Sequence, residues 1–421
     1  MAAEGPCLAE LLAAPVGELA LWTRGGRGVA GRGGTVLALT GPRRLQRLAG
    51  LWRLVDVGVV GTAGAAVALV SSTFDDDSPS PSLLHVPAEL VRVGTGDDAR
   101  PERWAQAVDP ASLRAALDAD AALAGASHGA RVAETADVVG PRVPGGSGAA
   151  ADDDDGDAAA YTSLVRDVLG DIESGTVAKV VTARQVRIAA APQVLDQLPA
   201  RLAQAYPDAW TYAVGGLVGA SPEMLAARRG DRIASRVLAG SLPRGERPDD
   251  ELVAELLADP RMRSEHEHAA RSVLDPLRAV AALDDEQPEP YVLTLPNIHH
   301  LATDVAGRLA EGAGLLDVVD AIHPTAAVAG TPRAAAMAII ARRERHDRGR
   351  YAGPVGWLDS AGDGEIGLAL RCGQVEGASI RLHAGGGIVA GADPDAELAE
   401  TESKLRPVRE ALAAAAADLA G

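Results

Sequence analysis

Lysine occurs at only two positions of this 421-residue chain, Lys179 and Lys404. The other 38 of its 40 basic residues are arginine. A coding bias toward arginine would replace lysine wherever a guanidinium serves equally well. A buried ammonium can lose its proton near neutral pH, whereas a guanidinium cannot. The two lysines are therefore the first candidates for acid–base chemistry.

Carboxylates accompany the second lysine. Glu397, Glu400 and Lys404 are three and four residues apart, so a helix would place them on one face. A Glu–Lys pair at this spacing is commonly an exposed ion pair with little effect on stability. Arginine would serve that purpose too, so the retained lysine favours a functional role. Glu223, in GASPEML, follows a glycine turn and a proline, and it is either a reactive or a simply exposed carboxylate.

A second acidic cluster alternates with histidines. Glu265 and Glu267 flank His266 and precede His268 in a helical pattern. A helical zinc site needs histidines four residues apart, and these two are two apart, so they point to different faces. A helix carboxylate that meets another from the C-terminal helix would instead suit Mg²⁺, which takes few protein oxygens and completes its shell with water and a substrate anion.

Apolar periodicity predicts the elements that must position these residues. Alternation predicts strands at 35–40, 65–74 and 177–188, the last of which would carry Lys179. Residues 210–240 form strands separated by glycine turns, a pattern typical of antiparallel hairpins. Helical spacing of the apolar residues predicts helices at 111–125, 161–175, 250–277, 334–346 and 396–420.

Composition restricts the class of protein. The chain is 47% hydrophobic and 23% charged, enough for a large core in one large or two ordinary domains. Its net charge of −18 argues against nucleic-acid and anionic-membrane partners, which require a basic surface. Cys7 and Cys372 are too few for a disulfide framework. The N-terminal residues show no secretory signal, so we expect a cytoplasmic protein with no membrane partner.

One low-complexity segment interrupts the pattern. Residues 141–160 combine Pro, Gly and Ala with four consecutive aspartates, which predicts a flexible acidic insertion. The expected organisation is therefore an N-terminal part of the fold at 1–140, this insertion, and a catalytic region at 161–421.

From Asp171 to its end the chain resembles the chorismate-utilising enzymes, and among them it is most similar to isochorismate synthases. The resemblance rests on a series of stretches in family order. They are KVVTAR (179–184), GASPEML (219–225), LAGSLPRG (238–245), RSEHEHAARSVLDPL (263–277), LPNIHHLATDVAG (295–307), DAIHPTAAVAGTPRAAA (320–336), YAGPVGWLDSAGDGE (351–365), LALRC (368–372) and AGGGIVAGADPDAELAETESK (384–404).

The resemblance implies a large α/β (α+β) fold in which antiparallel sheets face each other with helices outside. It also implies chorismate as substrate, Mg²⁺ as cofactor and a monomer. Isochorismate and salicylate synthases have a lysine where Lys179 stands because their nucleophile is water, whereas the ammonia-using relatives have another residue. The lysine of the PIKGT stretch of aminodeoxychorismate synthases is absent from residues 237–241.

The family chemistry also assigns catalytic roles. Lys179 would be the base that activates water for attack at C2, for which its pKa must fall from roughly 10.4 toward about 7 or 8. Glu223 would be the acid that protonates the departing C4 hydroxyl, which requires a raised pKa. Mg²⁺ would be held by Glu265 and Glu400, with Glu397 assisting. Glu265 is preferred to Glu267 because it starts an apolar stripe along the helix.

The remaining assignments concern the dianionic substrate. Arg371 would pair with the enolpyruvyl carboxylate, and Lys404 would supply a second cation. Glycine and serine amides would donate hydrogen bonds to carboxylate oxygens at close approach. His300 is either a contact to the ring hydroxyl or a core histidine. The substrate-binding residues are thus Gly240, Ser241, His300, Arg371, Gly386 and Lys404.

Three alternatives stay open at this point. A salicylate synthase would make isochorismate and then eliminate pyruvate with the same residues. A catalytically silent chorismate-binding protein is disfavoured because both lysines are retained. An unrelated metal hydrolase is disfavoured by the histidine spacing. The product could feed menaquinone or siderophore synthesis.

Overall fold

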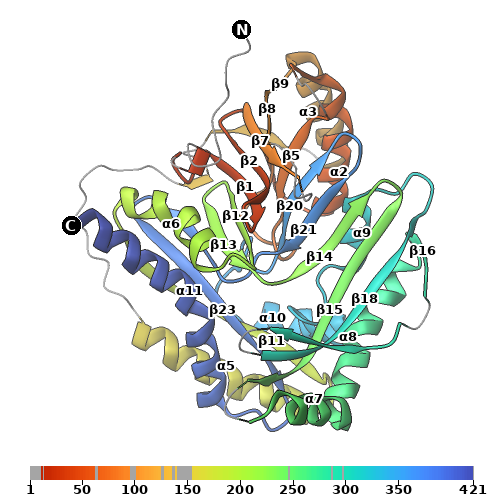
Figure 1. Cartoon of the computed structure of the whole chain (residues 1–421), viewed down its shortest axis with the longest axis vertical. Helices are drawn as coiled ribbons and strands as arrows, with labels where there is room; N and C mark the ends of the chain where they lie inside the picture. Colours follow the sequence, from red (N-terminus) through yellow and green to blue (C-terminus); the bar gives the residue numbers. More distant parts are fainter. Residues whose placement is uncertain are drawn as a thin grey trace.

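The computed structural model describes residues 11–12, 14–61, 65–94, 101–124, 128–134, 138–139, 154–244, 247–285, 288–295 and 298–420. Two large antiparallel sheets face each other and helices cover their outer sides, as the resemblance implies (Figure 1). The predicted hairpins at 210–240 are confirmed, with Gly215 and Gly216 at positive φ in the tight turn of the first.

The first sheet has ten strands. In spatial order they are β19 (Gly330–Thr331), β11 (Lys179–Ala189), β23 (Ser379–Val389), β22 (Cys372–Glu376), β13 (Leu217–Ser221), β12 (Trp210–Val214), β1 (Leu19–Arg24), β2 (Arg27–Arg32), β7 (Glu89–Val93) and β8 (Glu102–Ala105).

The second sheet has eleven strands. In spatial order they are β10 (Arg131–Ala133), β3 (Thr35–Leu39), β6 (Ser82–Val86), β5 (Val67–Ser71), β20 (Pro354–Asp359), β21 (Gly364–Leu368), β14 (Met224–Arg229), β15 (Arg232–Pro243), β18 (Ile298–Leu309) and β16 (Ala281–Leu283), and β17 (Tyr291–Leu295) also pairs with β18. A separate pair consists of β4 (Val59–Val60) and β9 (Ala107–Val108).

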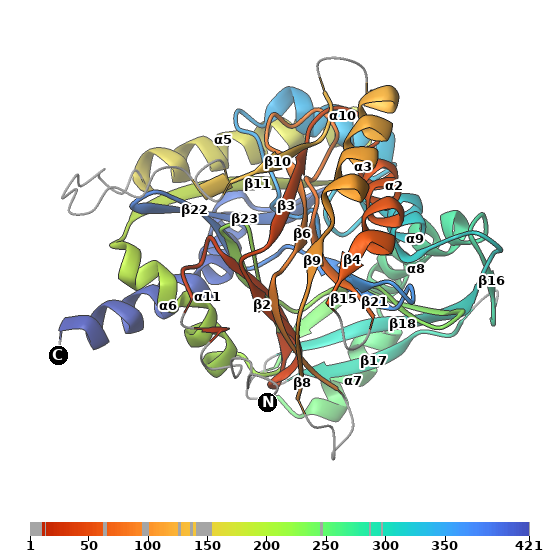
Figure 2. The same cartoon turned by 90° about the horizontal axis from the view of Figure 1, so that it is seen from above.

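The helices lie mainly outside the sheets. They are α2 (Arg44–Val55), α3 (Pro110–Ala124), α5 (Asp154–Glu173), α6 (Pro192–Ala205), α7 (Asp249–Ala258), α8 (Pro260–Leu277), α9 (Leu315–Ile322), α10 (Arg333–Arg343) and α11 (Pro394–Ala420), with a short 3₁₀ turn at Asp56–Gly58. Figure 2 shows α2 and α3 side by side next to the second sheet, where they also contact each other.

In both sheets a block of N-terminal strands joins a block of strands from later in the chain. The N-terminal strand β1 pairs with β12, and β5 pairs with β20. Side chains between the sheets form one core, which includes Trp22, Leu69 and Tyr212. The N-terminal third therefore completes the sheets that carry the rest of the chain.

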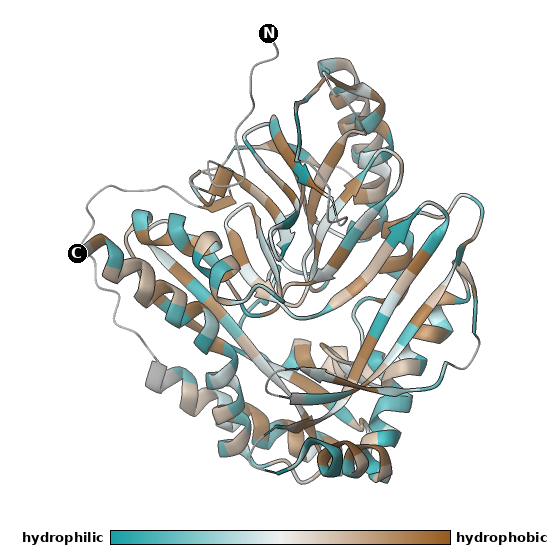
Figure 3. Cartoon of the chain, viewed as in Figure 1, coloured by the Kyte–Doolittle hydropathy of each residue, from teal (hydrophilic) through white to brown (hydrophobic). Residues whose placement is uncertain are grey.

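A second core lies between the first sheet and helices α6 and α11. Leu198 and Leu202 of α6 and Leu405 of α11 are buried there against the strands. Figure 3 shows hydrophobic and hydrophilic residues alternating along both helices, as expected for helices with one face on a sheet and one in water. None of the helices in the described parts of the chain is long and apolar enough to cross a membrane.

Two sequence predictions need correction. The acidic insertion was expected to be flexible up to residue 160, but α5 begins at Asp154, where aspartates at a helix N-terminus followed by alanines favour helix. Residues 141–153 lie outside the described part. The helical pattern at 250–277 contains two helices, because Asp259 accepts hydrogen bonds from the amides of Arg261 and Met262 and so caps α8 at Pro260.

Candidate active site

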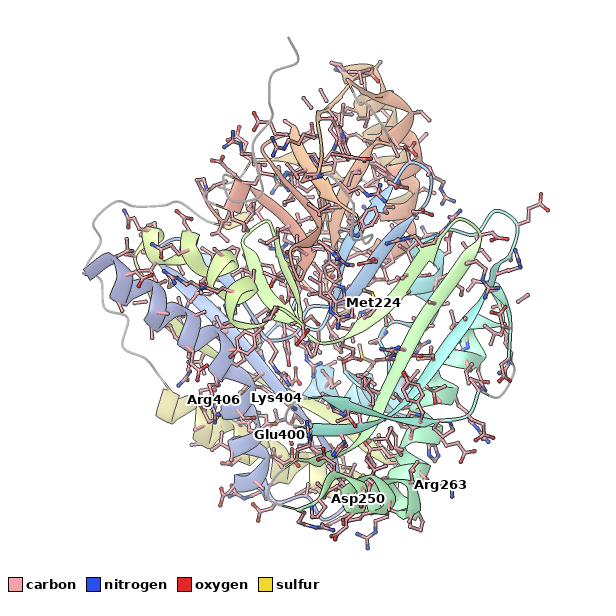
Figure 4. The ribbon with its side chains drawn as sticks, in the orientation of Figure 1. Met224, Asp250, Arg263, Glu400, Lys404 and Arg406 are labelled. Atoms are coloured by element: carbon pink, nitrogen blue, oxygen red, sulfur yellow. The ribbon has the colours of Figure 1, made fainter. Side chains whose placement is uncertain are left out.

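The candidate residues gather where the chain passes between the sheets. Glu223 lies between β13 of the first sheet and β14 of the second, and Arg371 lies between β21 of the second sheet and β22 of the first. Lys179 is the first residue of β11. Figure 4 shows Met224, which follows Glu223, above Glu400 and Lys404 of α11, while Arg406 points to the outside of that helix.

Lys179 reaches across the end of the first sheet. Its Nζ donates a hydrogen bond to Oε1 of Glu265 on α8, at 2.9 Å. Its Cε lies 2.6 Å from the position that a Cβ on Gly387 would occupy. A side chain at 387 would therefore collide with the lysine stem. The glycine run 385–387, which pairs with β11, thus leaves room for Lys179.

Glu223 is the acid that the sequence predicted, and its surroundings fit that role. Its backbone is fixed by the Ser221 hydroxyl, which accepts from the Glu223 amide at 3.2 Å, and by its carbonyl, which accepts from Leu368. Burial raises the pKa of Glu223 to about 7. Three cations act in the opposite direction, and these are Arg371, Lys179 and Lys404. The carboxyl is thus poised between protonated and ionised forms near neutral pH.

Arg371 presents a guanidinium that has no counterion in the part of the chain that the structure describes. Its backbone is left-handed, with φ of 50°. Within the described residues no carboxylate pairs with its side chain, although Glu400 and Glu223 are close enough to act on it electrostatically. Burial lowers the pKa of Arg371. A buried cation without a partner is costly, so this position suits a substrate carboxylate.

Lys404 and Glu400 form the pair that helical spacing predicted. The Lys404 ammonium donates to the Glu400 carboxylate and, at 2.8 Å, to the carbonyl oxygen of Gly385. Burial lowers the pKa of Lys404, and the Glu400 charge opposes this effect. The pair therefore ties α11 to β23 beside Arg371 and leaves Lys404 as a second, partly buried cation.

Glu397 lies one turn earlier on α11. Its Oε2 is buried and has no hydrogen-bond partner, and it lies 2.7 Å from the position of a Cβ on Gly386. Burial and then the charge of Glu400 raise the pKa of Glu397 to about 7. A buried carboxylate oxygen without a donor needs a proton or a cation.

The two glutamates of α8 lie on different faces. Glu265 faces Lys179, whereas Glu267 forms an exposed ion pair with Arg271. The preference for Glu265 over Glu267 agrees with this placement. Both ring nitrogens of His266 are occupied, by the Ala239 carbonyl and the Thr303 hydroxyl, and His268 contacts the Ser264 carbonyl instead. The two rings thus point to different partners, and His266 ties α8 to β15 and β18.

The structure brings the carboxylates expected to hold Mg²⁺ only partly together. Glu265 is held by Lys179 and Glu400 by Lys404, and in the described parts of the chain no three His, Cys, Asp or Glu side chains are arranged to hold a metal together. Mg²⁺ commonly takes one or two protein carboxylates and completes its shell with water and substrate oxygens. The unpartnered Oε2 of Glu397 is a donor of the required kind.

The remaining substrate-binding candidates lie at the edge of the second sheet. Gly240 has a φ of 75°, in an irregularity of the β15–β18 pairing, and a Cβ there would lie 3.2 Å from the Met262 carbonyl. Ser241 is paired with His300 of β18. Burial lowers the pKa of His300. The role of His300 in substrate binding stays a prediction.

Two tyrosines that the sequence analysis did not single out also lie at the site. Tyr351 is buried, acts electrostatically on Arg371, and its hydroxyl lies 3.2 Å from the position of a Cβ on Gly385. Tyr161 accepts a hydrogen bond from the Thr182 hydroxyl and lies against Gly386. The chain has only five tyrosines, and this scarcity is a signal in the sequence that could have marked them as candidates.

Comparison with known proteins identifies the family. The sequence pattern described as "Chorismate binding enzyme" matches residues 132–413, which is more than half of the chain. The chain belongs to this family.

Several relatives of this chorismate-binding enzyme are isochorismate synthases by name. The chain is 36% identical over 267 residues to isochorismate synthase DhbC of Bacillus subtilis (strain 168), which covers 60% of this chain and 67% of DhbC. It is 38% identical over 195 residues to isochorismate synthase EntC of Escherichia coli (strain K12), over 45% of this chain and 49% of EntC. An anthranilate synthase component 1 of Thermococcus kodakarensis is 32% identical over 259 residues, 60% of each chain.

Solved structures of the same family share the fold. The crystal structure of DhbC from Bacillus anthracis superimposes with a TM-score of 0.69 and 25% identity, over 96% of this chain and 99% of that one. Anthranilate synthase component I from Streptococcus pneumoniae gives a TM-score of 0.66 at 17% identity, over 92% of both chains, which is a likeness of fold alone. The predicted arrangement of facing antiparallel sheets is thus confirmed for this chorismate-binding enzyme.

Proposed function

We propose that this chain is a magnesium-dependent isochorismate synthase, an isomerase that adds water at C2 of chorismate and expels the C4 hydroxyl. The observation that carries the proposal is the position of Glu223, a carboxyl with a pKa of about 7 within reach of the charges of two lysines and an arginine. Similarity to DhbC and EntC, which are isochorismate synthases by name, supports the same reaction.

We assign substrate binding to the two cations of the site, Arg371 and Lys404. Chorismate carries two carboxylates, and Arg371 has no counterion among the described residues. A guanidinium binds a carboxylate through two parallel hydrogen bonds, so Arg371 takes the enolpyruvyl carboxylate. Lys404 adds a second positive charge beside it. Binding of the dianion therefore supplies a counterion to Arg371.

Proton transfer needs a base on one side and an acid on the other. Lys179 takes a proton from the water that attacks C2, and Glu223 gives its proton to the C4 hydroxyl, which leaves as water. Glu265 forms an ion pair with the Lys179 side chain, so the Glu265 carboxylate must turn to another partner before Lys179 can take the proton.

The carboxylates of this site also suit a divalent cation. Glu265 and Glu400 would hold Mg²⁺, with Glu397 assisting, because these oxygens are ligands that Mg²⁺ prefers and Oε2 of Glu397 has no other partner. Bound Mg²⁺ would supply positive charge that fixes the ring carboxylate and orients the ring. The chain's own contribution is to hold the three carboxylates near two lysines.

The water nucleophile follows from the residue at position 179. Among the chorismate-utilising enzymes that this chain resembles, a lysine at that place accompanies water and another residue accompanies ammonia. Relatives of this chain include both isochorismate synthases and anthranilate synthases, so Lys179 is what favours the first. We extend the proposal to a cytoplasmic monomer, as expected from the sequence.

One incubation tests the reaction. The purified protein is mixed with chorismate and Mg²⁺, with and without ammonium, and the products are separated by chromatography. Isochorismate alone is the expected product. Salicylate with pyruvate would replace the proposal by a salicylate synthase, anthranilate would replace it by an ammonia-using enzyme, and unchanged chorismate would contradict all three.

A further inference from the structure

A cavity of about 470 Å³ lies apart from the proposed catalytic and metal-binding residues, none of which is among the described residues that line it. Its walls come from the segment before β20, from β13, and from β22 and β23. The residues that matter for its chemistry are Leu217, Arg350, Tyr351, Gln374, Arg381 and His383. Its volume is in the range of pockets that hold small molecules.

Arg350 is a buried cation in the wall of this cavity. It is only 5% exposed, and its guanidinium donates to the carbonyl oxygens of Val214 and Gly215 and to Oε1 of Gln374, at 2.6–2.8 Å. All three acceptors are neutral, and burial lowers the pKa of Arg350 to about 10. Buried arginines are normally paired with an anion. Within the described parts of the chain, Arg350 therefore has its hydrogen bonds without charge compensation.

Two further polar atoms of the wall are buried without a hydrogen-bond partner. They are Nδ1 of His383, a residue that is 4% exposed, and Nε of Arg381. Buried donors without partners are rare and costly. The acidic side chains of the wall are already engaged, since Glu376 pairs with Arg381 and Asp347 accepts from the hydroxyls of Ser78 and Ser80. Of the three arginines among the described lining residues, Arg348 and Arg381 have carboxylate partners, and Arg350 has none.

Apolar groups complete the lining. Leu217, Pro81 and Val139 line the same cavity, and Tyr351 stacks on His383 with ring centroids 5.1 Å apart. Such a lining suits a compact apolar body rather than a bare inorganic ion. From the uncompensated arginine, the unpartnered histidine nitrogen and these apolar walls, we propose that the cavity is a binding site for a small organic carboxylate, with the carboxylate toward Arg350 and Arg381.

Tyr351 connects this cavity to the candidate active site. One part of the residue lines the cavity, while its hydroxyl lies against Gly385, whose carbonyl accepts from Lys404. An occupant would therefore press on the strand that positions Lys404, from a place that chorismate does not use.

Calorimetric titration with benzoate tests the site, because benzoate joins a carboxylate to an apolar ring. Benzamide is the neutral control of the same shape, and inorganic phosphate is the anion without an apolar body. The variants are Arg350→Gln and Arg381→Gln in the cavity, and Arg371→Gln in the candidate active site. Arg381 lies at the edge of the cavity, so its variant keeps the test valid if Arg350→Gln fails to fold.

We expect benzoate to bind the wild type and Arg371→Gln equally well, and Arg381→Gln about tenfold more weakly, as for one lost charge-assisted hydrogen bond. Benzamide and phosphate should not compete. The proposal is overturned if benzoate gives no heat up to about 10 mM, a concentration that detects even millimolar affinity. It is equally overturned if benzamide or phosphate binds as well, or if Arg371→Gln alone abolishes binding. No turnover is measured, so failure here leaves the proposed function untouched.

Discussion

The Nζ of Lys179 lies 2.9 Å from Oε1 of Glu265, although 86 positions separate the two residues in the chain. Lys179 opens a strand of the first sheet, and Glu265 comes from α8, which packs on β15 of the second sheet. The ion pair therefore spans the two halves of the fold at the place where substrate is proposed to bind. Movement of the Glu265 carboxylate away from Lys179 would leave the Lys179 amine free to act as the base. The same movement would make a carboxylate oxygen available to bind Mg²⁺.

Lys179→Arg should lower kcat by about 10²–10⁴-fold, because a guanidinium keeps its proton and cannot act as a base. The variant should retain its ion pair with Glu265 and its melting temperature, measured by circular dichroism. Arg187→Lys, a half-exposed position of the same strand, is the matched control and should turn over normally. An arginine variant with nearly full activity would remove Lys179 from the role of base.

The activity should decline as pH rises through about 7, because Glu223 must be protonated to act as the acid and its pKa is about 7. Glu223→Gln should lose most activity and also this limb of the pH profile. Glu267→Gln, an exposed glutamate paired with Arg271, is the control and should keep the wild-type profile. A profile in which the Gln variant keeps the same alkaline limb would assign the titration to another group.

The same pKa predicts a change of stability. Between about 4.5 and about 7 the folded state binds a proton at Glu223 that the unfolded state has released, so stability falls as pH rises through this window. Glu223→Gln should therefore melt above the wild type at about pH 8, and the difference should vanish at about pH 4, where both states are protonated. Scanning calorimetry at the two pH values measures this difference, and equal melting temperatures at the higher pH would contradict it.

Glu265→Ala and Glu400→Ala should each raise the Mg²⁺ concentration for half-maximal binding by at least about tenfold, because each removes a carboxylate ligand. Calorimetric titration of Mg²⁺ measures this without turnover. Glu267→Ala lies two residues from Glu265 on the other face of α8, so it should titrate like the wild type. Unchanged Mg²⁺ binding in the first two variants would point to a different ligand set.

Gly387→Ala should reduce turnover while barely changing the melting temperature. The new Cβ would lie 2.6 Å from Cε of Lys179, and the flexible lysine stem would shift rather than the backbone. Gly170→Ala on the surface of α5 has free space around it and should be neutral or stabilising by up to about 1 kcal/mol. A fully active Gly387→Ala would show that the lysine does not need its present position.

The sequence determined the features that depend on neighbours along the chain. Alternation and glycine turns predicted the β12–β13 hairpin, and helical spacing predicted that Glu397, Glu400 and Lys404 share one face of α11. These predictions succeed because strand and helix periods are local properties. The start of α5 at Asp154 was missed because the composition of a segment does not show what its helix packs against.

The tertiary structure decided which distant residues meet. The pairing of Lys179 with Glu265 and the placement of Glu223 and Arg371 at two of the crossings between sheets depend on strand order, which no local period encodes. Packing also decided the charges, since only burial by the surrounding elements raises the pKa of Glu223 to about 7 and leaves Arg350 buried with no anion partner among the described residues. The residue types could be read from the sequence. Their mutual distances and their burial from water arise only when the two sheets pack against each other around them.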